Sequence, residues 1–529
     1  MDCVVGSGPA GVACAAALLQ RGREVHMLDA GLRLEPEREQ IVARLAQSPP
    51  EKWSAEDRNW LTSGMSPTAR GIPEKLLFGS DHPYRPAANP PNISLDRVGL
   101  RPSFALGGLS TVWGAAMLPY PARDLVDWPI NPDELAPHYK AVLELTGLSA
   151  ELDDLTDLFP LFTESPGRLE MSRQAQALHR SLDRNRDRLR QEGIWFGRAR
   201  VAVRANNGSQ SGGCVYCGMC MYGCPYGYIY NSAATVKRMI SSAKFRYQPD
   251  AVVASVHETD KEAVVGGSHR LTGERFEIRA QRVFLAAGAI PTSGILLRSL
   301  PAYDQTLRMK DSQYFLLPVM LTRRIGKVRE ERLHSLSQMF LELIDPRISP
   351  HTVHLQVYSF NDLIGKAIRK SFGALAGPLG FLARELENRL LLIQGFVHSA
   401  HSSEIAVTLR RGVAEGRDQL QLEAVINPGA RTVVHQVVRK LARNSFRLGI
   451  VPLPMLLQIA EPGRSFHAGG AFPMRQRPSG FETDRLGRPA GWQRVHAVDA
   501  TVFPSIPATT ITFTIMANAH RIASEAATA

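Results

Sequence analysis

The chain of 529 residues has no long apolar run and few cysteines. A helix that crosses a membrane needs roughly 20 consecutive apolar residues, so we expect no ordinary transmembrane segment. The first expected strand begins at Asp2 and leaves no room for a leader, so secretion by a signal peptide is not expected. Six cysteines are too few for a disulfide scaffold. These absences predict a cytoplasmic protein, and its length and 44% hydrophobic content predict two or three domains.

The sequence also lacks any recognisable nucleic-acid-binding module, although its net charge is +12. The basic residues are scattered, so nucleic acid is not an expected partner. One basic amphipathic segment, residues 361–393, has two interpretations. It forms two helices of a globular domain joined at Gly377-Pro378, the more frequent situation for amphipathic helices. Alternatively, it lies on the anionic inner membrane surface, with an apolar side and a basic side that consist of Phe372, Leu375, Leu379 and Phe381, and of Lys366, Arg369 and Lys370.

The two ends of the chain have patterns that belong to one nucleotide site. Residues 1–31 predict a strand, a Gly-rich turn, an Ala/Leu helix and a second strand. In such a unit Gly6 permits the tight turn, Gly8 lets the backbone approach a pyrophosphate, and Gly11 lets helix and strand pack closely. Asp29, at the tip of the second strand, accepts hydrogen bonds from ribose hydroxyls. Residues 495–523 predict a strand, a Pro-rich loop and a closing helix.

Two internal segments extend this nucleotide site. Residues 282–300 predict a buried strand that ends at Ala286-Ala287-Gly288 and is followed by a helix. Small residues there would bring backbone amides close to a cofactor. The segment GGLSTVWG at 107–114 could bring backbone close to a flat ring. Each segment taken alone is also compatible with an ordinary buried turn.

Together these segments resemble the glucose–methanol–choline (GMC) oxidoreductases, a superfamily of FAD enzymes. The resemblance rests on the amino-terminal fingerprint, GGLSTVWGA, RVFLAAGAIPTSGILL, and the motifs FHAGGAFPM and VHAVDATVFPS. It implies an α/β fold with a Rossmann-like FAD domain at 1–130, 200–300 and 455–529, interrupted by a Cys-rich insertion at 211–230. It also implies a substrate domain of antiparallel sheet and helices at 131–199 and 301–454. The implied cofactor residues are Gly6, Gly8, Pro9, Ala10, Gly11, Asp29, Ala30, Gly107, Gly108, Ser110, Val112, Trp113, Gly114, Val253, Ala287, Gly288, Asp499, Ala500 and Thr510.

The same resemblance assigns the catalytic residues. His467 matches the family's active-site histidine, which would take the hydroxyl proton while a hydride passes to the flavin. The second position of the usual pair falls on Ala508 or Thr509, and a threonine hydroxyl can hold a substrate oxygen but cannot act as a base. His398 or His401 could instead enter from the substrate domain. Val112 stands where pyranose oxidases carry the histidine that attaches their flavin, so the resemblance implies non-covalent FAD.

The expected reaction is oxidation of an alcohol group on a sugar, a glycoside or a related polyol. Two alternatives remain open at this point. The missing second base is compatible with a flavin-dependent isomerase or epimerase that oxidises and re-reduces its substrate. A flavoprotein without catalysis, acting as a binding module, is the other.

The four cysteines Cys214, Cys217, Cys220 and Cys224 have the spacing C-x2-C-x2-C-x3-C-P of bacterial ferredoxins. They predict one iron–sulfur cluster, either [3Fe–4S] on three thiolates or [4Fe–4S] on four. Certain bacterial GMC sugar dehydrogenases carry such a segment and pass electrons to an acceptor other than oxygen, which here would be a protein or a quinone. Four close thiolates also suit zinc, and metal-free cysteines are the third interpretation.

Overall fold

The amino-terminal strand lies at the centre of a five-stranded parallel sheet that gathers segments from the whole chain. The computed structural model describes residues 1–64, 74–87, 91–206, 212–372, 380–414 and 417–528. The order of strands in this sheet is β20-β9-β1-β2-β5, and all four pairings are parallel. The bounds are β1 Asp2–Val5, β2 Val25–Leu28, β5 Phe245–Gln248, β9 Val283–Leu285 and β20 Val495–Ala497.

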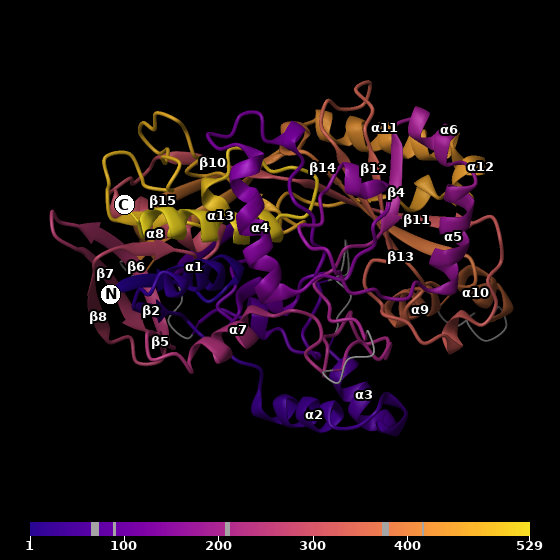
Figure 1. The fold of residues 1–529 in the computed structure, drawn as a ribbon, viewed down its shortest axis with the longest axis horizontal. Helices are drawn as coiled ribbons and strands as arrows, with labels where there is room; N and C mark the ends of the chain where they lie inside the picture. The colour runs from indigo at the N-terminus through magenta and orange to yellow at the C-terminus, as the bar shows by residue number, and fades with distance from the viewer. Residues whose placement is uncertain (65–73, 88–90, 207–211, 373–379, 415–416, 529) are drawn as a thin grey trace.

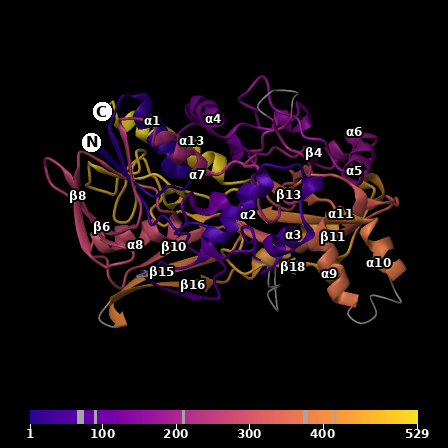
Figure 2. The same ribbon diagram turned by 90° about the horizontal axis from the view of Figure 1, so that it is seen from below.

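Helices cover this sheet and join the two ends of the chain. α1 packs against α13, and Figure 2 shows these helices side by side with both termini at the same end of the molecule. α4 packs on α13 in turn. The bounds are α1 Pro9–Gln20, α4 Pro132–Thr146, α7 Ser232–Met239, α8 Ala289–Ser299 and α13 Thr512–Ala526. The α/β fold and its Rossmann-like unit are therefore as the sequence predicts.

A second sheet lies at the other end of the long axis (Figure 1). It is antiparallel, in the order β17-β11-β14-β13-β12-β4, and β18 also pairs with β11. Its strands are β4 Ile194–Arg198, β11 Gln313–Leu321, β12 Met339–Leu343, β13 Val353–Tyr358, β14 Leu390–Val397, β17 Ile450–Pro452 and β18 Gln458–Ile459. The helices near it are α5 Arg173–Asp183, α6 Arg186–Gln191, α9 Asp362–Phe372, α10 Gly380–Glu387, α11 Gly429–Arg443 and α12 Ser445–Leu448.

Residue alternation gives this sheet one face for the core and one for the site. Phe315, Leu317, Leu355 and Val357 pack in a core with the apolar sides of α5 and α11. Because successive strand residues point to opposite faces, their neighbours along the strands, such as Gln356 and Tyr358, point the other way. That face turns toward the parallel sheet.

A third sheet shares its hydrophobic core with the parallel sheet. Its order is β19-β10-β15-β16-β3, and apolar residues of β10, β15 and β16 belong to the same core as the parallel sheet. The segments 306–311 and 404–425 share this core, and helix α4 packs on α13. The assignment of 131–199 and 301–454 to a substrate domain stays a prediction. The bounds are β3 Asn92–Asp96, β10 Thr306–Asp311, β15 Glu404–Ala414, β16 Arg417–Val425 and β19 Ala468–Gly469.

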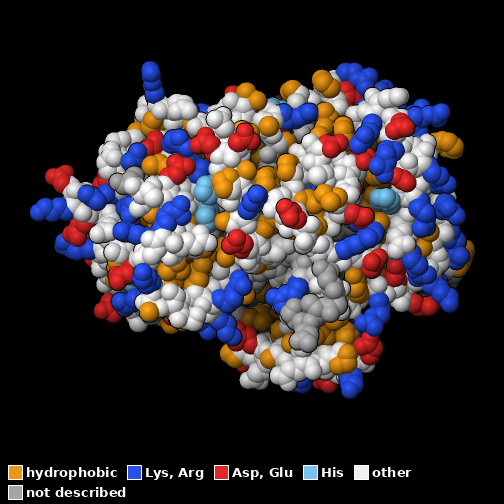
Figure 3. Space-filling view, viewed as in Figure 1, with side chains coloured by type: hydrophobic (Ala, Val, Ile, Leu, Met, Phe, Trp, Pro, Cys, Tyr) orange, Lys and Arg blue, Asp and Glu red, His pale blue; other side chains and the backbone are white. Residues whose placement is uncertain are grey.

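The remaining elements lie at the periphery. A three-stranded sheet consists of β6 Ala251–Glu258, β7 Ala263–His269 and β8 Arg275–Ala280. Helices α2 Pro36–Ala46 and α3 Ala55–Thr62 project from one side in Figure 1. On the face shown in Figure 3, Lys and Arg are interspersed with Asp and Glu.

The basic segment 361–393 contains α9, α10 and β14. Ile368 and Ala383 are buried, whereas Phe381, expected on the apolar side, is 64% exposed. Lys366 pairs with Asp362. The side chains of Arg369, Lys370 and Phe372, and all of Leu375, Gly377, Pro378 and Leu379, lie outside the described residues. Contact with a membrane surface therefore stays a prediction. Within the described part of the chain, no helix has the length and apolar character needed to span a bilayer.

Candidate active site

A cavity of about 420 Å³ lies where the nucleotide-binding turns meet the site face of the seven-stranded sheet. Most of the residues predicted for cofactor and catalysis line it, although they come from six separate segments. They are Gly6, Gly8, Pro9, Ala10, Asp29, Ala30, Gly108, Ser110, Val112, Trp113, Gly114, Val253, Ala287, Gly288, His467, Asp499 and Ala500. Gly11, Gly107, Thr509 and Thr510 do not line the cavity.

The glycines of the nucleotide-binding turns fall into two groups, according to whether an added Cβ atom would collide with protein or enter open space. Gly6 has a φ of +105°, and a Cβ on Gly11 would lie 1.9 Å from the Gly6 carbonyl oxygen. Helix α1 can therefore approach the turn only with glycine at position 11. A Cβ on Gly8 or on Gly288 would meet no atom within 4 Å. These two glycines precede the first turns of α1 and α8, so two helix N-termini border open space suited to phosphate groups.

Two buried carboxylates fix the walls around this space. Asp29 accepts hydrogen bonds from Ser7 Oγ at 2.7 Å and from Tyr247 Oη at 3.0 Å. Burial raises the pKa of Asp29 to about 6, against these hydrogen bonds, which lower it. Asp499 accepts from the Gly288 amide at 2.8 Å and from Thr292 Oγ1 at 2.6 Å. Asp499 thus ties the end of β20 to the start of α8.

The segment 107–114 provides one side of the cavity. Its Val112 side chain lines the cavity and offers no atom that could bond to a flavin. Trp113 is held by a hydrogen bond from its Nε1 to the Tyr230 carbonyl at 2.9 Å. Lys75 Nζ donates to the Trp113 carbonyl at 2.9 Å. Backbone at 107–114 is therefore anchored from behind.

His467 enters the cavity from a strained turn. Phe466, directly before it, has a φ of +59°, a conformation that costs energy for a residue with a side chain. The His467 amide donates to Ser465 Oγ, which in turn donates to the buried Asp311 at 2.8 Å. The His467 ring stacks on Phe396 with centroids 4.9 Å apart, and its buried Nδ1 has no hydrogen-bond partner in the described chain.

Burial lowers the pKa of His467 to about 3, and the nearby His354 adds to this shift. The imidazole is therefore neutral at pH 7 and keeps a lone pair for an incoming proton.

Residues 508–510 do not present a polar side chain to the cavity at the family's second catalytic position. Ala508 packs against Tyr314 and Phe396. Thr509 is fully buried, and its hydroxyl has no partner among the described atoms. Thr510 Oγ1 accepts from the Leu118 amide at 3.0 Å. The wall beside Phe396 is therefore apolar at the place where the family pattern puts a second polar residue.

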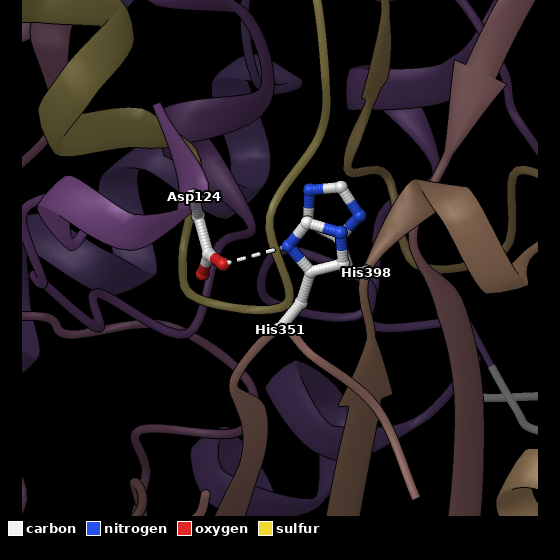
Figure 4. A group of neighbouring side chains, drawn as sticks. All are labelled: Asp124, His351 and His398. Atoms are coloured by element: carbon white, nitrogen blue, oxygen red, sulfur yellow. Dashed lines mark hydrogen bonds and ion pairs between the residues drawn. The ribbon is translucent and has the colours of Figure 1, made fainter. Parts of the chain in front are cut away.

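His398 does not supply that residue, because it opens onto a different cavity with His351 and Asp124. His401 does not line the flavin cavity either. Figure 4 shows His351 stacked on His398, with His351 Nδ1 3.0 Å from Asp124 Oδ1.

The spacing of Asp124, His351 and His398 is that of a metal site, but the proton positions are unsuitable. The Ala400 amide donates to His398 Nδ1 at 3.0 Å. The neutral ring therefore carries its proton on Nε2, where a metal would need a lone pair.

Sequence reasoning missed the side chains of the seven-stranded sheet that line the cavity. These are the polar Tyr314, Tyr358 and Gln394 and the aromatic Phe396. Strand β13 reads VHLQVY, in which a polar or aromatic residue alternates with a core residue. This alternation was the available signal, but it could not show which sheet face meets the cofactor.

The cysteine loop packs between the two parts of the molecule. The backbone of Cys217 forms an isolated β-bridge with Leu333, and Met221 lines the flavin cavity. All four thiols interact electrostatically with one another. Burial, and to a smaller extent the neighbouring thiols, raise the pKa of Cys214 and Cys217 to about 12. No three of their sulfur atoms lie within 4.8 Å of one another.

Backbone amides already point at several of these sulfur atoms. Tyr228 donates to Cys224 Sγ at 3.3 Å, and the amides of Tyr226 and Ile229 also bond to this sulfur. Cys214 and Cys217 are each bonded by one amide. Because a neutral thiol is a weak acceptor, this arrangement suits thiolates.

Lys75 lies between the flavin cavity and the cysteine loop. It lines the cavity and interacts electrostatically with Cys220 and Cys224. Burial lowers the pKa of Lys75 to about 8, although both thiols act to raise it.

Comparison with known proteins identifies the family. Residues 96–301 match the family model described as GMC oxidoreductase, and residues 4–34 match the model of an NAD(P)-binding Rossmann-like domain. This match covers GGLSTVWGA and the β9–α8 turn, both of which border the cavity. The chain belongs to the GMC oxidoreductase family.

Solved structures share the fold of this GMC oxidoreductase over nearly its whole length. Pyridoxine 4-oxidase from Mesorbium loti has a TM-score of 0.57 at 14% identity, with 99% of this chain and 98% of that chain covered. A structure on FAD modification in a formate oxidase variant of Aspergillus oryzae RIB40 has a TM-score of 0.61 at 13% identity. A further formate oxidase has a TM-score of 0.60 at 14% identity. The two cover 99% of this chain and 97% of theirs. No curated protein sequence matches the chain.

The GMC oxidoreductase is an FAD-dependent enzyme, and its cavity fits that cofactor. Open space at Gly8 and Gly288 faces two helix N-termini, and Asp29 stands at the tip of β2. The matches give no support to an iron–sulfur cluster or to a sugar substrate.

We predict that Gly11→Ala and Gly8→Ala separate packing from cofactor binding. Gly11→Ala should destabilise the flavin-free protein by about 1–3 kcal/mol, because its Cβ would overlap the Gly6 carbonyl. Gly8→Ala should leave this stability within about 0.5 kcal/mol but weaken FAD binding, because its Cβ enters the cavity. Thermal unfolding of flavin-free protein and FAD titration measure both effects. Equal destabilisation by the two changes would contradict this division.

Proposed function

We propose that this GMC oxidoreductase is a dehydrogenase that oxidises an alcohol group of a sugar, a glycoside or a related polyol. Its electrons pass to an acceptor other than oxygen. The observation that carries the proposal is the partly buried four-cysteine loop, whose Met221 lines the flavin cavity and two of whose thiols interact with the cavity-lining Lys75. The structural neighbours are named as oxidases, so oxygen use is the competing outcome.

FAD, when bound, supplies the acceptor for a hydride from the carbon that carries the hydroxyl group. His467 has the matching task of taking the hydroxyl proton. Its imidazole is neutral, and its Nδ1 has no partner among the described residues. The hydrogen bonds from the His467 amide to Ser465, and from Ser465 to Asp311, hold the backbone of this residue in place. Thr509 does not line the cavity, so its side chain does not contact a substrate there.

The lining supports a polyol substrate. Tyr314, Tyr358 and Gln394 offer polar groups, and Phe396 offers an aromatic face. A sugar has hydroxyl groups that can bond to these polar groups and apolar C–H faces that can stack on the Phe396 ring. We also propose that the flavin is held without a covalent bond, because Val112 offers no attachment atom.

We further propose that the cysteine loop holds one iron–sulfur cluster on Cys214, Cys217, Cys220 and, where the cluster is [4Fe–4S], Cys224. Amide donors to the sulfurs support thiolates at these positions. A single zinc ion would hold its four sulfurs about 3.8 Å apart, closer together than any three of these lie. A cluster of several iron atoms spans a wider set of sulfurs. It would take electrons one at a time from the reduced enzyme.

We predict that a sugar or glycoside will bleach the flavin in the absence of oxygen. Anaerobic stopped-flow mixing with a panel of aldoses, ketoses and methyl glycosides measures the flavin absorbance. Reoxidation by a quinone or a one-electron dye should be faster than by dissolved oxygen. Faster reoxidation by oxygen would make the protein an oxidase. Isomerised product without net bleaching would make it an isomerase, and no bleaching by any member would contradict the proposal.

We predict that His467→Ala lowers the rate of flavin reduction by about 10²- to 10⁴-fold, because the hydroxyl proton loses its acceptor. His398→Ala is the matched control, since His398 opens onto the other cavity. With a pKa of about 3, His467 stays neutral down to acid pH. The rate should therefore show no decline near pH 6.5, the ordinary histidine value, and should fall only toward about pH 3. A rate unchanged by His467→Ala would remove this residue from the mechanism.

We predict that anaerobically prepared protein contains iron and acid-labile sulfide, with a paramagnetic signal in one redox state. Iron and sulfide analysis, together with electron paramagnetic resonance, tests this. Lys75→Met should shift the cluster's reduction potential to more negative values, because a positive charge stabilises the reduced state. Lys75→Arg keeps the positive charge and should therefore shift the potential less. Zinc without sulfide would replace the cluster with a structural ion, and metal-free protein would contradict both.

A further inference from the structure

A row of buried polar side chains runs along strand β13, on one face of the seven-stranded sheet, and ends at the flavin cavity. Glu342 of β12 and His354 of β13 are both fully buried, and Glu342 Oε1 lies 2.6 Å from His354 Nδ1. His354 Nε2 lies 3.1 Å from Gln356 Nε2. Gln356 Oε1 lies 3.0 Å from the Tyr358 hydroxyl. None of these contacts is used in the hydride-transfer scheme above.

The direction of every hydrogen bond in this row follows from the charge of Glu342. An ionised carboxylate only accepts, so His354 Nδ1 must donate to it. A neutral imidazole with its proton on Nδ1 accepts at Nε2, so the Gln356 amide nitrogen must face it, as it does. The Gln356 oxygen then faces Tyr358, and the tyrosine hydroxyl must donate inward.

The orientation of the Gln356 amide favours the ionised form of Glu342, because it agrees at both of its ends with a carboxylate that accepts. Burial raises the pKa of Glu342, and the contact with His354 and the positive charge of Arg200 act against this shift. A protonated Glu342 would reverse all three bonds and require the opposite amide orientation.

The consequence lies at the cavity wall. Since the Tyr358 proton is committed to Gln356 and the Ser337 side chain also bonds to the Tyr358 oxygen, this oxygen has one lone pair left to accept a hydrogen bond from a ligand. This oxygen is close to the cofactor segment, because a Cβ built on Gly114 would lie 3.5 Å from it. Tyr358 also lines the flavin cavity.

We propose that Tyr358 is a specificity-determining residue that accepts a hydrogen bond from a substrate hydroxyl group, and that Glu342 fixes this polarity through His354 and Gln356. The substrate part of this proposal rests on the proposed polyol function. The site would distinguish a hydroxyl group, which donates, from a fluorine atom or an ether oxygen, which do not. Glu342, His354 and Gln356 are positioning residues, because they act through Tyr358.

The polarity can be tested without a substrate. Nitrogen-15 NMR of histidine-labelled, flavin-loaded protein reports which ring nitrogen of His354 carries the proton, with His354→Gln used to assign the signal. We expect a neutral ring protonated on Nδ1. A ring protonated on Nε2 would mean that the hydrogen bonds from Glu342 to Tyr358 run in the opposite direction and that Tyr358 donates to the ligand, which would overturn the proposal.

The specificity can be tested with the panel sugar that bleaches the flavin and with its monodeoxy-monofluoro analogues. For one ring position, wild-type protein should bind the fluorinated analogue at least about 10-fold more weakly than the sugar, because Tyr358 meets no donor. Tyr358→Phe should lose this discrimination. Gln356→Leu, which keeps the tyrosine but frees its proton, should reduce it.

Equal discrimination in wild type and Tyr358→Phe would overturn the proposal. If no panel sugar bleaches the flavin, the proposed function fails, and the His354 measurement still decides the polarity of the row.

Discussion

The buried carboxylate of Asp499 is the contact on which the rest of the site depends. It accepts from the Gly288 amide, from Thr292, and from the amide of Thr501. The first two bonds place the first turn of α8 against the cofactor space. The third shapes the turn at Ala500, whose carbonyl accepts from Gly470, three residues after His467. One side chain thus sets the cofactor wall and the catalytic segment relative to each other, and its loss would leave several buried amides unpaired.

The sequence alone predicts the nucleotide half of this arrangement well, because its signals are local. Gly6, Gly8 and Gly11 lie within six residues, and each role depends on the turn between one strand and one helix. Asp29 lines the cavity as its position at a strand tip suggests, but its oxygens are already bonded to Ser7 and Tyr247. The tyrosine comes from β5, more than two hundred residues later, and no local pattern announces it.

The substrate half is harder to predict for a geometric reason. Residues of β10 and β15 carry ordinary alternating patterns, and nothing in them tells whether they join one core or the other. The same limit applies to His398, which sequence reasoning offered as a second base. His398 and Phe396 lie on one segment, yet Phe396 stacks on His467 while His398 opens onto another cavity. His398 follows Phe396 by two residues and lies just past the end of β14, and this small difference in position places it at the other cavity.

Burial gives the cavity its chemical character. His467 is kept neutral by the same lack of water that raises the pKa of Asp311 to about 7 and lowers that of Lys75 to about 8. Charge in such a place persists only where a partner holds it, as Lys75 and the cysteine loop would do for each other once the thiols are ionised. A site that must accept a proton and then release two electrons benefits from this arrangement, because each charged state has a defined partner. His467 and Lys75 both line the flavin cavity, and desolvation lowers the pKa of both side chains.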